Sequence, residues 1–321
     1  MLARAEYWML WSRAWRGSKS PRPGAGESEA ALGVVGGVPT RYTGRAMHNP
    51  QVPETLEGWS VLHQMFRVRW DSLKGLPADR RKRLAEEATA LLAPLEGSKE
   101  GPTGLVQVLG HKADLMLIHF RKTFDELGQT EMQVTRLGLF DHLEPATSYV
   151  SIVELGLYEM TAKIHDDLGS RGLKTGTDEF EKAFDEEMAR QRERMIGRLY
   201  TEIPRRRQVC FYPMNKRRGE IKNWFTVPFE KRAAMMREHG FIGRAYSGQV
   251  TQIISGSIGL DDWEWGVDLF ADDPIVFKKL IYEMRFDEAS ADYAEFGPFY
   301  VGLQFSAREL PAFLDGRTPS L

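Results

Sequence analysis

The pattern of hydrophobic and polar residues becomes regular near residue 59. Positions 59–70 alternate between apolar and polar side chains, which predicts a β-strand. A helix is expected over 80–92, because Pro77 lies just before it and proline suits an early helical position. The remaining pattern of the first half predicts two strands at 105–109 and 115–120, a helix at 123–137 and a strand at 149–158.

The last third of the chain repeats this order of elements. The pattern predicts strands at 208–212, 250–255, 263–270 and 299–305, and helices at 228–239 and 273–282. Each half therefore follows the order β-α-β-β-α-β, which is the ferredoxin-like unit. Two such units side by side predict an α+β subunit with a barrel-like body. Pro77 and Pro228 begin equivalent helices, so Ala88 corresponds to His239 and only the second half has an imidazole there.

The domain boundaries follow from the same repeat. We expect an N-terminal ferredoxin-like half over 48–177 and a C-terminal half over 203–321. A charged helix over 178–202 connects them, with Thr177 and Asp178 as its N-terminal capping residues. Residues 1–47 differ from the rest, with three Trp and three Arg before Gly17 and a mixture of Gly, Ala, Pro and Ser after it. We interpret them as a disordered leader or a start assigned too early, with Met47 as the alternative start; a targeting segment is the other interpretation.

Composition narrows the class of protein. The 321 residues include 45 acidic and 43 basic side chains, a formal charge of −2, which argues against a general nucleic-acid binder. The single cysteine, Cys210, excludes an internal disulfide framework and any metal site built from several cysteines. No apolar run is long enough to span a membrane. The cytoplasm is the simplest compartment for such a chain.

Among the seven histidines, His239 is the candidate for chemistry. No pair of histidines has the HExxH spacing of a zinc site. His239 ends the predicted helix and precedes Gly240, which suits a left-handed cap. One interpretation is therefore a histidine that caps the helix C-terminus and is favoured by the helix dipole. The other is an axial ligand to haem iron, which requires one neutral imidazole and no cysteine.

A basic stretch surrounds the strand that follows. Six cations and no anion lie between Arg205 and Arg218, on either side of an apolar strand that contains Tyr212. A solvated basic loop is one interpretation. The other is the mouth of a site for an anionic, partly apolar ligand such as a carboxylated tetrapyrrole. Tyr212 could be a core residue, a hydrogen-bond donor or a redox-active phenol.

Several motifs, in one order along the chain, resemble those of a known family. They are FYPMNK at 211–216, Trp224, MREHG at 236–240, Gly243-Arg244, GLDDWEWGV at 259–267, MRFDE at 284–288 and FGPFY at 296–300. In these residues the chain resembles the coproheme decarboxylases, the peroxide-dependent branch of the chlorite dismutase superfamily. The resemblance covers 59–305 and is strongest from Arg198 onward. It implies two ferredoxin-like halves per subunit and a homopentamer.

The resemblance also implies a role for particular residues. His239 would be the proximal ligand of the iron, and Tyr212 the catalytic residue that is oxidised to a radical. Arg198, Lys216 and Ser290 would hold propionates, and Gln252 would lie on the distal side of the iron. The substrate would also contact the rest of the segment from Tyr212 to Lys216, namely Pro213, Met214 and Asn215.

The reaction implied is the oxidative decarboxylation of two propionates of iron coproporphyrin III to vinyl groups, with hydrogen peroxide as oxidant and haem b as product. The iron porphyrin serves as both substrate and redox centre, so no permanent cofactor is required. Two alternatives remain open. One is a chlorite dismutase, against which Gln252 argues because those enzymes have an arginine there. The other is a haem-binding or haem-transfer protein without catalysis.

Overall fold

The computed structural model describes residues 52–321, and the expectations for residues 1–47 lie outside this range. The nine strands are β1 (Thr55–Val68), β2 (Thr103–Val108), β3 (Leu115–Arg121), β4 (Leu143–Gly156), β5 (Gln208–Lys216), β6 (Val250–Gly256), β7 (Trp265–Ala271), β8 (Ala294–Phe296) and β9 (Tyr300–Phe305) in that range. The α-helices there are α2 (Trp70–Lys74), α3 (Ala78–Leu92), α4 (Phe124–Thr135), α5 (Tyr158–Ser170), α6 (Asp178–Leu199), α7 (Phe229–Ala245), α8 (Ile275–Met284), α9 (Glu288–Ala291) and α10 (Leu310–Leu314). Short 3₁₀ helices are η1 (Ala93–Leu95), η2 (Gly138–His142), η3 (Trp224–Thr226) and η4 (Ala307–Glu309).

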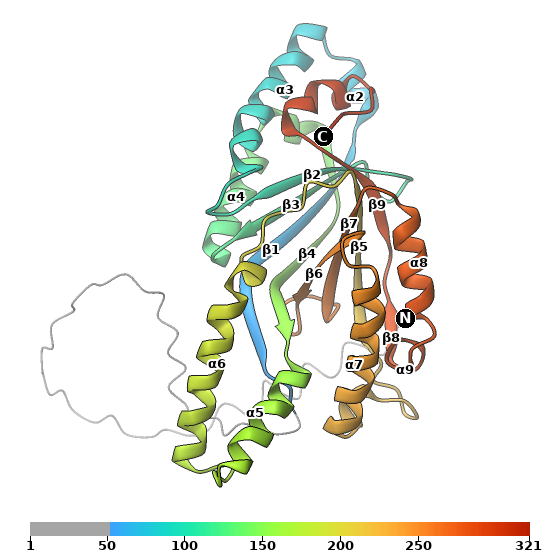
Figure 1. The fold of residues 1–321 in the computed structure, drawn as a ribbon. Coiled ribbons are helices and arrows are strands. Elements are labelled where there is room, and N and C mark those ends of the chain that lie inside the picture. Colours follow the sequence, from blue (N-terminus) through green and yellow to red (C-terminus); the bar gives the residue numbers. More distant parts are fainter. Residues whose placement is uncertain (1–51) are drawn as a thin grey trace, which may run out of the picture. The chain divides into compact units, whose positions relative to one another are not determined.

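The sheet closes on itself through antiparallel pairs. Its order is β7-β6-β4-β1-β3-β2-β9-β5-β8, and β5 pairs in addition with β7. The first half supplies the neighbours β4-β1-β3-β2 and the second half β9-β5-β7-β6, which is the same arrangement used twice. The pairs β2–β9 and β4–β6 join the halves. The two predicted ferredoxin-like units therefore form one closed ring of strands (Figure 1).

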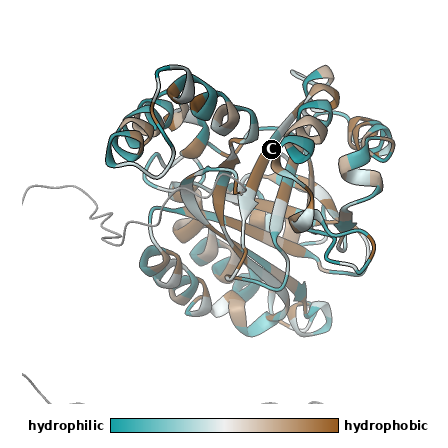
Figure 2. Cartoon of the chain, turned by 90° about the horizontal axis from the view of Figure 1, so that it is seen from below, coloured by the Kyte–Doolittle hydropathy of each residue, from teal (hydrophilic) through white to brown (hydrophobic). Residues whose placement is uncertain are grey.

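Apolar side chains form one cluster inside this ring of strands and two clusters on its outer surface, one on each half. The lumen holds side chains from seven strands, among them Val61, Met116 and Phe211. A second cluster lies between the strands of the first half and the helices α3 and α10, and a third between β5, β7 and the helices α7 and α8. Figure 2 shows the same division, with hydrophobic residues concentrated on the strands and hydrophilic residues on the helices around them. The two outer layers are the places where the halves can differ.

Several predicted boundaries were wrong in instructive ways. The strand expected at 149–158 begins at Leu143 and ends at Gly156, and Tyr158 instead begins α5. The helix expected to end at His239 continues to Ala245, although a glycine in a helix costs about 1 kcal/mol relative to alanine. It continues because Ile242 and Tyr246 pack on the third cluster, so burial of apolar surface outweighs the cost of Gly240. Gly240 is consequently helical, with no positive φ.

The connecting helix was predicted closely. It is α6, and Thr177 caps it by accepting a hydrogen bond from the backbone N–H of Phe180. Together with α5 it encloses a small separate cluster around Phe180 and Phe184. The domain boundaries themselves stay an interpretation, because the described residues, 52–321, all belong to one compact unit. No helix among residues 52–321 is both long enough and apolar enough to cross a bilayer.

Candidate functional site

Strand β5 directs alternate side chains to opposite faces of the ring. Val209 and Phe211 belong to the cluster in the lumen, whereas Cys210, Tyr212 and Met214 belong to the outer cluster below α7 and α8. This is the period of two that a strand imposes. Tyr212 therefore lies on the outer face, in the cluster that α7 and α8 cover. His239 lies on α7, which Figure 1 shows beside β5.

Tyr212 is held in an aromatic environment. Its side chain is buried, and its ring stacks on Phe299 with 4.6 Å between the centroids and at 5.7 Å from Phe296. Burial raises the pKa of the Tyr212 phenol above its usual value. The phenol thus keeps its proton at neutral pH and can give it up together with an electron.

Lys216 lies four residues further along the same strand, on the same face. Its ammonium donates to the backbone carbonyl of Ala289 at 3.0 Å and lies over the ring of Trp224, 4.4 Å from the centroid. Burial lowers the pKa of Lys216 to about 8, although the nearby carboxylates of Asp287 and Glu264 act in the opposite direction. A cation held this way can bind a carboxylate or exchange a proton near neutral pH.

His239 lies inside α7 rather than at its end, so the capping interpretation is wrong. Its Nδ1 is 3.0 Å from Oδ2 of Asp287, a carboxylate with no exposed surface. Burial alone would raise the pKa of Asp287, but hydrogen bonds from His239 and Ser290 and the charge of the imidazole outweigh it and hold that pKa below its usual value. An ionised carboxylate only accepts hydrogen bonds, so Nδ1 of His239 donates and the lone pair of a neutral ring is left on Nε2.

The short helix α9 brings these groups together. Asp287 caps it by accepting from the backbone N–H of Ser290 at 2.8 Å, and the Ser290 hydroxyl donates to the same carboxylate at 3.1 Å. That hydroxyl is also 3.4 Å from Nδ1 of His239. Ala289, whose carbonyl binds Lys216, is the neighbouring residue. An imidazole whose Nε2 has no hydrogen-bond partner within residues 52–321 and a buried ammonium are thus tied to one turn of helix, which fits an iron porphyrin with carboxylate arms.

Across the described part of the chain, the other residues predicted for the site form no hydrogen bond or ion pair with His239, Tyr212 or the Lys216 ammonium. Gln252 is exposed on β6 and pairs across the sheet with Leu269, which lies on the same outer face as Tyr212. Asn215 accepts from the backbone N–H of Glu264, and Gly297 donates its N–H to the carbonyl of Pro213. Arg198 is exposed on the last turn of α6, and within residues 52–321 no hydrogen bond or ion pair joins it to the groups above. The roles expected for these residues, and equally for Tyr212, Lys216, His239 and Ser290, stay predictions.

The basic stretch is largely engaged in the fold itself. Arg207 donates to the backbone carbonyls of Gln304 and Pro319. The other pairs join Arg206 to Asp272, Arg217 to Glu295 and Arg218 to Glu264. Lys216 is the member of the stretch that enters the site. The cations therefore do not form a uniform cationic mouth.

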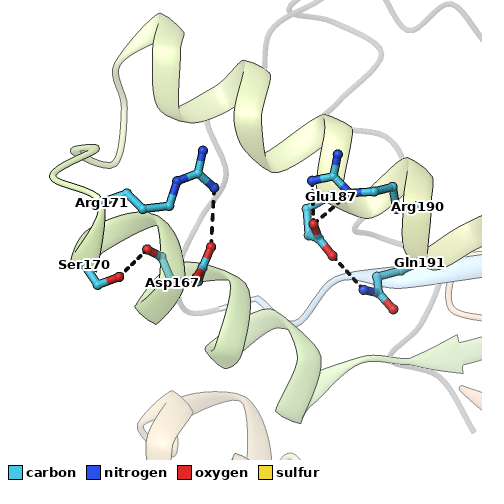
Figure 3. Close-up of polar contacts among 6 residues, drawn as sticks. All are labelled: Asp167, Ser170, Arg171, Glu187, Arg190 and Gln191. Carbon is cyan, nitrogen blue, oxygen red and sulfur yellow. Dashed lines mark hydrogen bonds and ion pairs between the residues drawn. The ribbon is translucent and has the colours of Figure 1, made fainter.

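A cleft of about 360 Å³ opens elsewhere, between α5 and α6. Its polar lining is partly paired: Asp167 on α5 pairs with Arg171 at the C-cap of that helix, and Glu187 on α6 accepts from Gln191. Glu187 also accepts from Arg190, a residue of α6 outside the lining (Figure 3). None of the residues predicted for the site lines it. The candidate site is therefore the outer face below α7.

Comparison with known protein families decides the family. The family model described as chlorite dismutase matches residues 81–305 of this sequence. The chain belongs to the chlorite dismutase family. One relative of this chain is the coproheme decarboxylase of Staphylococcus saprophyticus. It is 41% identical over 256 residues, which cover 79% of this chain and 94% of that protein.

Two other relatives are much longer than this chain. A putative heme-binding protein of Natronomonas pharaonis is 43% identical over 82% of this chain, but the match covers only 42% of that relative. A second putative heme-binding protein, from Haloquadratum walsbyi, is 41% identical over 83% of this chain, and the match covers 48% of that relative. The chain thus spans less than half the length of these two relatives.

Two solved structures show the same fold. A heme-binding protein from Thermus thermophilus has 40% identity and a TM-score of 0.70, with 84% of this chain and 99% of that chain covered. A mutant chlorite dismutase from Candidatus Nitrospira defluvii has a TM-score of 0.60 at 18% identity, over 81% and 96% of the two chains. The second likeness supports the fold alone.

Two partners in this site were not assigned a role from the sequence. Asp287 orients His239 from 48 residues away. The spacing from Asp287 to Ser290 indicates that Asp287 caps a helix, but it does not indicate the contact with His239. Tyr158, which was predicted to end a strand, begins α5, and its hydroxyl accepts a hydrogen bond from Trp224. Neither contact has a local sequence signature, because both join elements far apart in the chain.

Proposed function

We propose that this protein decarboxylates iron coproporphyrin III oxidatively to haem b, with hydrogen peroxide as oxidant. The observation that carries the proposal is the outer face of β5, which carries the buried Tyr212 phenol and the buried Lys216 ammonium. The ammonium is tied through Ala289 to α9, and Asp287, which caps α9, orients the imidazole of His239. The 41% identity with a coproheme decarboxylase over nearly all of that protein supports it.

Each of the two decarboxylations balances in atoms and charge. A propionate arm, one hydrogen peroxide and one proton give a vinyl arm, carbon dioxide and two waters. The substrate iron supplies the oxidising power when it reacts with peroxide. The protein supplies the hydrogen-atom acceptor for the propionate β-carbon, which we assign to Tyr212 after its own oxidation.

The other residues bind and orient. Nε2 of His239 would hold the iron, and Asp287 would keep the ring in that tautomer. The Lys216 ammonium would bind the reacting carboxylate until carbon dioxide leaves. Pro213, Met214, Asn215, Gln252, Arg198 and Ser290 complete the proposed substrate contacts. A homopentamer and a cytoplasmic location also belong to the proposal.

The test is incubation with iron coproporphyrin III and hydrogen peroxide, followed by mass spectrometry of the porphyrin. We expect the stepwise loss of two carboxyl groups, and Tyr212→Phe to bind the same porphyrin with at least about 100-fold slower loss. Tyr282→Phe, on the exposed side of α8, is the matched control and should react like the unmodified protein. An unaltered porphyrin with the unmodified protein would favour a haem carrier, and native turnover by Tyr212→Phe would remove Tyr212 from its role.

A further inference from the structure

Lys216 is the first member of a chain of aromatic contacts that leads away from the site. The Trp224 ring below its ammonium is itself buried, with 2% of its surface exposed. The indole Nε1 donates to the hydroxyl of Tyr158 at 3.3 Å. Tyr158 begins α5, the helix that follows the last strand of the first half, so a residue of the first half reaches the side chain that supports Lys216.

Tyr158 is itself fixed by α7, the helix that carries His239. Its ring stacks on Phe229 with 5.9 Å between centroids and 26° between planes. The guanidinium of Arg232 lies over the same ring, 5.8 Å from the centroid. Burial raises the pKa of the Tyr158 hydroxyl, while the hydrogen bond from Trp224 and the charge of Arg232 act the other way. The hydroxyl therefore stays protonated near neutral pH and remains an acceptor for the indole.

The contact decides which part of Trp224 faces Lys216. A buried indole N–H needs an acceptor, and Tyr158 provides one. The indole is also packed at its edge by Tyr293, with 5.4 Å between the centroids, so its orientation is determined from two sides. With this orientation the negative face of the ring lies below the ammonium, where it stabilises the charged form.

We propose that Tyr158 is a positioning residue for Lys216, because it holds the Trp224 ring below the ammonium that binds the reacting propionate. The part that concerns the propionate rests on the proposed function, whereas the coupling between the three side chains does not. The other charged groups that face Lys216 are the carboxylates of Asp287 and Glu264, and the substitutions below leave both in place.

The first experiment measures the coupling without any porphyrin. The full chain is labelled with 5-fluorotryptophan, the Trp224 resonance is assigned with Trp224→Phe, and its ¹⁹F chemical shift is followed with pH. We expect the Trp224 resonance to titrate near pH 8, where Lys216 loses its proton, and this titration to be absent in Lys216→Met.

The decisive variant is Tyr158→Phe, which removes one hydroxyl and keeps the ring on Phe229. We expect the titration midpoint to fall by about half to one pH unit, because a misplaced indole stabilises the ammonium less. The matched control is Tyr246→Phe, which removes the hydrogen bond from an α7-capping tyrosine to Glu283 at the surface and should leave the midpoint unchanged. A midpoint that Tyr158→Phe does not move, or a titration that survives Lys216→Met, overturns the proposal.

The second experiment uses peroxide-driven decarboxylation. In Tyr158→Phe the alkaline limb of kcat should shift to lower pH by the same amount, with the KM for iron coproporphyrin III changed less than about twofold. In a Trp224→Phe background, adding Tyr158→Phe should produce no further shift, because the bond it removes is already gone. A further shift in that background contradicts the proposal. If the unmodified protein leaves the porphyrin intact while the ¹⁹F results hold, the proposed function fails and the positioning role of Tyr158 stands.

Discussion

The two halves of the ring use one scaffold in opposite ways. Pro77 and Pro228 have nearly the same backbone conformation, with φ −55° and −54° and ψ 145° in both, and each precedes a helix on the outer face. Eleven residues after each proline lie Ala88 and His239. Ala88 is fully buried against a core completed by α10, whereas the His239 side chain keeps 26% of its surface exposed. Equivalent positions thus become a sealed core where α10 is added and a site where it is not.

The strands show the same contrast. Val61 pairs with Phe120 and Val209 with Phe270, which fixes the correspondence between β1 and β5. Tyr212 and Lys216 then correspond to Gln64 and Val68. Val68 and Lys216 are buried to a similar degree, with 6% and 8% exposed. Burial of an isopropyl group stabilises the first half, while burial of an ammonium costs free energy in the second. Such a cost indicates that chemistry, rather than packing, determines the residue at position 216.

The largest expected effect is on iron binding, and it distinguishes α7, which carries His239, from α3, which carries Ala88. His239→Ala should reduce the affinity for the porphyrin iron at least about 100-fold, while binding of metal-free coproporphyrin changes much less, because the contacts to the propionates remain. Absorbance titration of both porphyrins measures this, and added imidazole should restore the iron spectrum. The matched change in the other half, Ala88→Gly, should leave both affinities as they are. Unaltered iron spectra in His239→Ala would rule out His239 as the ligand.

The next prediction concerns the sealed half. Phe313 on α10 stacks on Phe305 and contacts Trp70, and 4% of it is exposed. Phe313→Ala should lower the free energy of unfolding by about 3–5 kcal/mol, the usual cost of removing a buried aromatic ring. Denaturant unfolding measures the loss, and the folded variant should bind the porphyrin normally. A loss of porphyrin affinity in the folded variant would mean that the two outer layers are not independent.

The smallest effect is a gain in stability at the site. Because the folded pKa of Lys216, about 8, lies below the unfolded pKa of about 10.5, burial destabilises the protein fully below pH 8 and not at all above pH 10.5. Lys216→Met should therefore raise the free energy of unfolding at pH 7 by up to about 3 kcal/mol, a gain that fades as the pH rises from 8 to 10.5. Unfolding curves at pH 7 and pH 10.5 test it. An equal gain at both values would show that packing, and not the charge, is responsible.

The sequence predicted the elements where local pattern and burial agree. The strand around Trp59, the helix after Pro77 and the connecting helix after Thr177 were all found, because each has a clear period and a terminal signal. The end of α7 was misplaced because the packing of Ile242 outweighs the helix-breaking tendency of Gly240. The carboxylate that orients His239 could not be predicted, since the hydrogen bond joins α7 to the residue before α9 and exists only in the folded chain.

The closure of the strands has a consequence for synthesis of the chain. β9, close to the C-terminus, is hydrogen-bonded to both β2 and β5. Until the ribosome has released residues 300–305, the backbone of β2 has one edge without its native partner, and such an edge can pair with another nascent chain. We therefore expect products truncated before β9 to aggregate rather than to accumulate as half-barrels, and this tendency to end once β9 has paired with β2 and β5.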